Sequence, residues 1–160
     1  TRAVYKAFGK DPNRYRPSAE ALMRRAVKEM ALYRTLAIID LINLLSMRSG
    51  HSIGGFDADK IEGDTLTLGV GEKDEPYEAI GRGLLNIEGL PVFRDSVGGI
   101  GTPTSDNERT KLSEDTRRLL MTINMYGDSE MTAEETENMA RELLGKYAGA
   151  SDIRISYWKP

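Results

Sequence analysis

Side chains suited to chemistry gather between residues 95 and 116, in the stretch DSVGGIGTPTSDNERTKLSEDT. It opens with Gly98, Gly99 and Gly101, which would let the backbone approach a ligand closely. The donors and acceptors that follow are Thr102, Thr104, Ser105, Asp106, Asn107, Arg109 and Thr110. A stretch of roughly twenty residues without regular structure is uncommon in a compact domain and is usually functional. We therefore expect a binding or catalytic loop here, with a surface loop of self-capping turns as the alternative.

A second stretch, GHSIGGFDADKIEGD at residues 50–64, holds the only histidine, His51, beside the adjacent glycines Gly54 and Gly55. One histidine cannot build a metal cluster, and a chain without cysteine has neither a thiolate nucleophile nor a disulfide. The GGIG run lacks the G-K-[ST] ending of a phosphate loop. We expect no metal and no organic cofactor, and we interpret this stretch as a turn whose backbone matters more than its histidine.

Isolated polar residues mark two other places. Asp40 and Asn43 lie three residues apart in an otherwise apolar segment, so both point to the same side of a helix. They either cap a neighbouring loop or project into a pocket. Arg82 stands between two glycines and could present its cation to a carboxylate or a phosphate, with a bulged strand and a surface arginine as the alternative.

The elements that must position these residues read as helices first and strands later. Apolar residues recur at helical spacing over 16–30 and fill almost every position of a second helix over 35–50, which we expect to be buried and to end at Gly50. Short alternating runs predict strands at 64–70, 76–80, 90–95 and 119–126. A last helix should begin at Thr132 with Glu135 completing a capping box, and 152–158 should form a final strand. This order predicts one α+β domain over 1–160, with a basic segment and helix at 1–34 and the core at 35–160.

The charge is unevenly distributed along the chain. Residues 1–34 carry nine cations and three carboxylates, a net +6, although the whole chain has a net charge of −3. A basic segment interleaved with tyrosines could bind a polyanion such as RNA; a solvated helix is the alternative. The candidate RNA-binding residues are Arg14, Arg16, Arg24, Arg25 and Lys28. The chain has no apolar run long enough to span a bilayer, and we expect a cytoplasmic protein without membrane contact.

The segment IIDLINLLSMRSGHSIGGFDADKIEGD resembles the tRNA-editing domain of the phenylalanyl-tRNA synthetase beta subunit. That family has Val-Asp-Val-Thr-Asn on a buried helix, then a glycine, then Pro-Leu-His-Ala-Phe-Asp-x-Asp-Lys-Ile. The later GGIG and SEDTRRLLMTI resemble its Gly-x-Met-Gly-Gly loop and the strand that follows. The resemblance covers residues 17–126. GRG, EGLPV and PTSDNERT look more like free-standing copies of the domain than like the synthetase.

The resemblance implies a three-layer α+β fold with a β-sandwich of unusual topology. It also implies the hydrolysis of a mischarged aminoacyl-tRNA, in which water attacks the ester carbonyl. The family's asparagine falls on Asn43, its histidine on Gly54, its next alanine on Gly55 and its strand glutamate on Thr122. Because the groups that recognise tyrosine are absent, we expect another amino acid, polar or charged, in a pocket enlarged at the two glycines.

Within this interpretation Ser105 and Asp106, with Thr104, position either the attacking water or the amino group of the substrate. The substrate-binding candidates are Asp40, Asn43, Gly54, Gly55, Arg82, Thr104, Arg109 and Thr122, with Arg82 or Arg109 meeting the terminal phosphate. Two alternatives stay open: a non-catalytic tRNA-binding or synthetase-associated module, and a hydrolase or binder of small amino-acid compounds.

Overall fold

The computed structural model describes residues 1–32, 34–127 and 129–158. The α-helices are α1 (Arg2–Ala7), α2 (Ser18–Val27), α3 (Ala37–Ser49) and α4 (Ala133–Ala148). Short 3-10 turns are η1 (Ala58–Lys60) and η2 (Glu108–Thr110). The strands are β1 (Ser52–Asp57), β2 (Thr67–Val70), β3 (Glu78–Ala79), β4 (Gly83–Leu84), β5 (Pro91–Arg94), β6 (Gly99–Gly101) and β7 (Leu119–Asn124).

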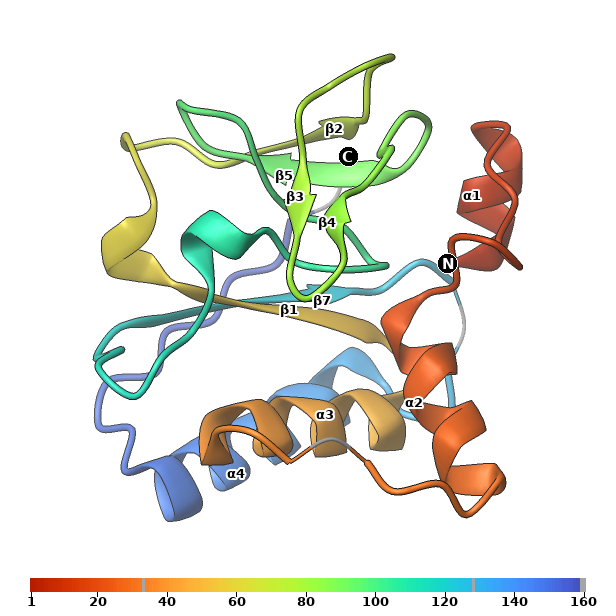
Figure 1. Cartoon of the computed structure of the whole chain (residues 1–160). Helices are drawn as coiled ribbons and strands as arrows, with labels where there is room; N and C mark the ends of the chain where they lie inside the picture. Colours follow the sequence, from red (N-terminus) through yellow and green to blue (C-terminus); the bar gives the residue numbers. More distant parts are fainter. Residues whose placement is uncertain (33, 128, 159–160) are drawn as a thin grey trace.

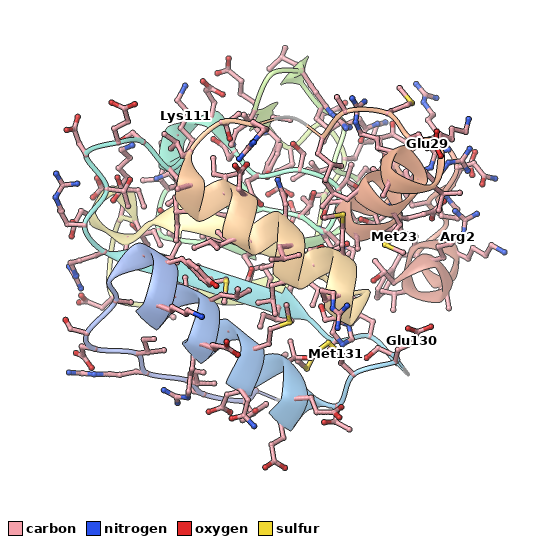
Figure 2. The ribbon with its side chains drawn as sticks, turned by 90° about the horizontal axis from the view of Figure 1, so that it is seen from below. Arg2, Met23, Glu29, Lys111, Glu130 and Met131 are labelled. Atoms are coloured by element: carbon pink, nitrogen blue, oxygen red, sulfur yellow. The ribbon has the colours of Figure 1, made fainter. Side chains whose placement is uncertain are left out.

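The elements form layers (Figure 1). Strands β1 and β7 pair antiparallel in the middle, with Gly54 opposite Thr122. Helices α3 and α4 cover one face of this pair and lie side by side when seen from below (Figure 2). The antiparallel sheet β2–β5–β6 and the hairpin β3–β4 lie on the other side. The predicted α+β fold is therefore confirmed.

Two apolar clusters hold the layers together. One joins α3, α4 and the β1–β7 sheet, through Ile42, Leu45, Ile53, Leu112, Ala140 and Leu143. The other lies between α1 and the upper strands, through Tyr5, Tyr77, Ala79, Ile87, Leu90 and Val92. Tyr5 has no exposed surface, so the basic N-terminal segment contributes to the core as well as to the surface.

The end of α3 and the start of α4 lie where the sequence predicts them. Helix α3 ends at Gly50, whose φ of 72° is in the left-handed region that favours glycine. Helix α4 begins with the predicted capping box of Thr132 and Glu135. One expectation for α3 was wrong, however: only one face of the helix is buried, and Leu44 on the other face is 39% exposed.

Three other expectations were also wrong. Residues 52–57 form the fully buried strand β1 rather than a turn. The 95–116 stretch is not without regular structure, because it contains β6 and η2. Residues 152–158 form no strand, since the alternating run finds no neighbouring strand to pair with; the carbonyl of Ile153 instead accepts a hydrogen bond from Arg141. No helix in the described part of the chain is long and apolar enough to cross a membrane.

Candidate functional site

Asp106 lies in the loop between β6 and η2 and contacts strand β1 of the central layer. It is partly buried, and its Oδ2 accepts a hydrogen bond of 3.1 Å from the backbone N–H of Gly55 on β1. Its own backbone carbonyl accepts from the N–H of Ile80, and it bridges to Gly101 of β6. Burial raises the pKa of Asp106 from 3.8 to about 7, against the opposing effect of the Gly55 hydrogen bond. The Oδ1 atom has no hydrogen-bond donor among the described residues. The side chain is therefore a fixed carboxyl group that can gain or lose a proton near neutral pH.

The glycines around Asp106 make room for protein side chains. A Cβ on Gly54 would lie 2.6 Å from Cζ of Phe56, and one on Gly101 would lie 2.4 Å from the same atom. A Cβ on Gly55 would lie 2.6 Å from Cδ1 of Ile42. The expectation that Gly54 and Gly55 enlarge a pocket wall is therefore wrong, because Phe56 and Ile42 occupy the space that the missing side chains leave.

Thr122 lies directly across from Gly54 on β7. Its Oγ1 is buried and has no hydrogen-bond partner among the described residues. The same atom would be 2.9 Å from a Cβ on Gly54. A buried hydroxyl without a partner is unusual in a folded protein. This one lies beside the Phe56 ring, on the side of the sheet that faces β6 and the Asp106 loop.

The loop that carries Asp106 is fixed by two buried tyrosines. The hydroxyl of Tyr5 is 2.8 Å from Oγ1 of Thr104. The hydroxyl of Tyr77 donates to the carbonyl of Ser105 at 2.7 Å, and burial together with the nearby Asp106 raises the pKa of Tyr77. The Ser105 hydroxyl donates to the backbone carbonyl of Asp106 at 3.5 Å rather than to its carboxyl group. Ser105 and Asp106 are thus neighbours without a side-chain contact between them.

The two candidate phosphate-binding arginines differ in their surroundings. Arg109 forms two hydrogen bonds to Asp95, at 2.9 and 2.8 Å, and a third to the carbonyl of Lys60. Arg82 is exposed in the turn between β3 and β4, and no described residue pairs with its side chain. Ile80, two residues before Arg82, donates its N–H to the backbone carbonyl of Asp106. The Arg82 cation therefore belongs to a hairpin that contacts the Asp106 loop.

Asp40 and Asn43 line a pocket, as one of the two alternatives predicted. The pocket has a volume of about 440 Å³ and lies between α3 and the segment that precedes it. Its walls are Ala31, Leu32, Arg34, Asp40, Asn43, Leu44 and Met47. None of them comes from β1, β7 or the Asp106 loop. The structure therefore separates Asp40 and Asn43 from the Asp106 group instead of bringing them into one pocket.

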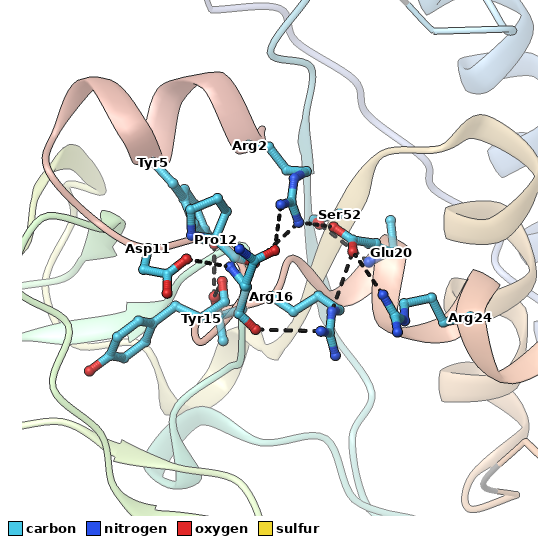
Figure 3. Close-up of polar contacts among 12 residues, drawn as sticks. Arg2, Tyr5, Asp11, Pro12, Tyr15, Arg16, Glu20, Arg24 and Ser52 are labelled. Atoms are coloured by element: carbon cyan, nitrogen blue, oxygen red, sulfur yellow. Dashed lines mark hydrogen bonds and ion pairs between the residues drawn. The ribbon is translucent and has the colours of Figure 1, made fainter.

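Several of the candidate RNA-binding residues are engaged within the protein. Figure 3 shows Arg2, Arg16 and Arg24 converging on Glu20, at 2.8, 3.3 and 3.9 Å. Arg14 stacks on the ring of Tyr15.

The other two candidate RNA-binding residues, Arg25 and Lys28, differ in their contacts. Arg25 donates to the carbonyl of Ala31 and thereby closes the end of α2. Lys28 is exposed. The surface is basic, but much of its charge is already committed to interactions with Glu20 and with neighbouring backbone.

Sequence reasoning missed the two tyrosines that hold the loop. Tyr5 and Tyr77 gave no local signal, because their partners Thr104 and Ser105 lie 99 and 28 residues away in the chain. The described residues include no group of three or more histidines, aspartates or glutamates that could hold a metal ion.

Residues 1–142 match the family model described as the B3/4 domain. No curated protein matches the chain.

Proposed function

The chain belongs to the B3/4 domain family, and this domain is found in the editing region of the phenylalanyl-tRNA synthetase beta subunit. From this premise we propose that the protein is a deacylase for mischarged aminoacyl-tRNA. The substrate is the ester that joins a wrong amino acid to the terminal ribose. An activity on tRNA would place the protein in the cytoplasm. The observation that carries the proposal is the geometry of the Asp106 carboxyl group: the N–H of Gly55 holds Oδ2 at 3.1 Å, and Oδ1 has no donor among the described residues.

Asp106 would act as the general base. A carboxyl group that titrates near neutral pH is well matched to proton transfer at that pH, and it is partly ionised there. Its Oδ1 accepts a proton from water while the water oxygen attacks the ester carbonyl carbon. The bond from that carbon to the ribose oxygen then breaks, and the proton passes to the ribose oxygen. Gly55 keeps Oδ2 in place through its N–H, so Oδ1 is the oxygen available to water.

Arg82 would contribute binding rather than chemistry. Its side chain has no partner among the described residues, and its hairpin touches the Asp106 loop through Ile80. A terminal phosphate of the tRNA is the natural partner for such a cation. Arg109 suits this role less well because Asp95 already occupies its guanidinium group. Positions 54 and 122 carry glycine and threonine where the resembling family has histidine and glutamate, so tyrosine is not the expected amino acid.

The test is single-turnover deacylation of a panel of mischarged tRNAs. The wild-type protein should release the amino acid from at least one of them, at a rate that rises with pH and levels off above about pH 7. Asp106→Asn should remove this activity, whereas Asp64→Asn, which removes an exposed carboxylate outside the site, should retain it. If the full panel is not hydrolysed but tRNA still binds with steep salt dependence, the non-catalytic module is correct and the deacylase proposal fails.

A further inference from the structure

The pocket beside α3 contains no residue of the Asp106 loop, so the proposed hydrolysis does not use it. We propose that it binds a free α-amino acid with an apolar side chain. The ligand is bound in its zwitterionic form and independently of tRNA. The pocket of about 440 Å³ falls within the usual size of small-molecule sites.

One helix face supplies most of the pocket. Asp40, Asn43, Leu44 and Met47 follow the i, i+3, i+4, i+7 spacing, so their side chains share one side of α3. This is the side opposite the core, since the buried residues of α3 are Ile42, Leu45, Ser46 and Ser49. Asp40 and Asn43 therefore lie outside the two apolar clusters of the described chain.

The polar groups match the two charges of an amino acid. Nε of Arg34 lies 3.7 Å from Oδ2 of Asp40, with side-chain exposures of 89% and 34%. An ion pair this long and this exposed contributes little to stability, so a ligand can replace it at small cost. The ammonium group of the ligand would bind Asp40 and its carboxylate would bind Arg34. The Asn43 amide, which both donates and accepts, can serve either group.

The apolar part of the pocket determines which side chain is accepted. Leu32 and Ala31 come from the segment before α3, and Leu44 and Met47 come from the helix. Leu44 is 39% exposed, so part of its apolar surface faces the pocket that it lines. An aliphatic or methionine-like side chain would bury this surface, whereas a charged side chain would be desolvated without a counter-ion.

Calorimetric titration of the full chain with L-methionine, without tRNA, tests the proposal. We expect saturable binding at millimolar concentrations or below. N-acetyl-L-methionine lacks the ammonium group and L-methioninamide lacks the carboxylate, so each should bind about tenfold more weakly, the loss of one charge-assisted hydrogen bond. L-lysine should bind more weakly than L-methionine.

Variants locate the site. Asp40→Asn and Leu44→Ser should each weaken the binding of L-methionine about tenfold. Both should lower the thermal midpoint of unfolding only slightly, because Asp40 is the acidic residue in the first turn of α3 and serine is a poorer helix former than leucine. Arg48→Gln is the matched control, because Arg48 is exposed on α3 but does not line the pocket. The absence of any saturable binding would overturn the proposal, as would equal affinity for L-methionine and its N-acetyl derivative or binding that Asp40→Asn leaves unchanged. Because no tRNA is present, neither result bears on the deacylase activity.

Discussion

Replacing Asp106 by asparagine should stabilise the protein in mild alkali while removing its hydrolytic activity. The rise in the Asp106 pKa from 3.8 to about 7 measures the cost of ionising this carboxyl group in the folded protein. At about 1.36 kcal/mol for each pKa unit, the cost reaches about 4 kcal/mol. This figure is an upper limit, because the residue as a whole is only partly buried and nearby water lowers the cost of the charge.

The sign of the effect depends on pH. Below about pH 4 the carboxyl group is protonated in both the folded and the unfolded chain, so Asp106 and asparagine should be nearly equivalent. Between about pH 4 and pH 7 the unfolded chain releases the proton while the folded chain retains it, so the free energy of unfolding of the wild type falls. Above about pH 7 the full cost is present. The asparagine variant avoids this loss, and its amide oxygen can still accept the Gly55 hydrogen bond.

Urea titrations at about pH 4 and about pH 8 measure the effect as the difference between variant and wild type. Far-ultraviolet circular dichroism is the appropriate signal, because the only tryptophan, Trp158, is 69% exposed and reports poorly on the core. Asp64→Asn, which removes an exposed carboxylate, is the control and should show no gain that grows with pH. Parallel pH dependence in wild type and Asp106→Asn would refute the reasoning, since it would mean that the buried carboxyl group carries no such cost.

Three further changes test the packing and the electrostatics. Gly101→Ala should lower the free energy of unfolding by about 1–3 kcal/mol, because the new Cβ would clash with the ring of Phe56. Gly145→Ala in α4 should raise it by about 0.5–1 kcal/mol in the same urea titration, because the nearest atom to the new Cβ is 4.0 Å away. Burial alone would raise the pKa of Asp95, but its ion pair with Arg109 and three backbone N–H bonds hold this pKa at about 2. Asp95 therefore stabilises the fold above about pH 4, and this contribution is lost as the pH falls toward 2. Asp95→Asn should therefore cost about 2 kcal/mol at neutral pH and flatten the acid side of the stability profile, and an unchanged acid profile would contradict the assignment. Thr132→Ala removes the side-chain cap of α4 and should cost about 1 kcal/mol, read from the thermal midpoint.

The helices were predictable because their signals are local. The start of α4 depends on Thr132 and Glu135, and the end of α3 depends on Gly50 alone. Strand β1 was not predictable in the same way, since two adjacent glycines argue against a strand when they are considered in isolation. Their reason is tertiary: Phe56 and Ile42 need the space that any side chain at 54 or 55 would take. The final alternating run failed for the converse reason, because a strand requires a partner that this segment does not have.

The candidate site was predictable as a set of residues but not as a geometry. The sequence singled out both Asp106 and Asp40, and the fold assigns them to different surroundings. Gly55 donates to Asp106 across 51 residues of chain, a contact with no local signature. The choice between the two arginines is equally non-local. It depends on the ion pair of Arg109 with Asp95, and on Arg82 having no partner among the residues that the structure describes.

The pairing of β1 with β7 also constrains how the chain can fold. The side chain of Asn124 bonds to the carbonyl of Ser52, 72 residues earlier, and no strand other than β7 completes the central pair. During synthesis β1 therefore stays without its partner strand until the ribosome has made β7. At about 5–20 residues per second, this takes several seconds. Helix α3 precedes β1 and can pack on Ile53 during that interval. Because α3 comes before β1 in the chain, the apolar face of β1 can be buried against this helix before β7 has been synthesised.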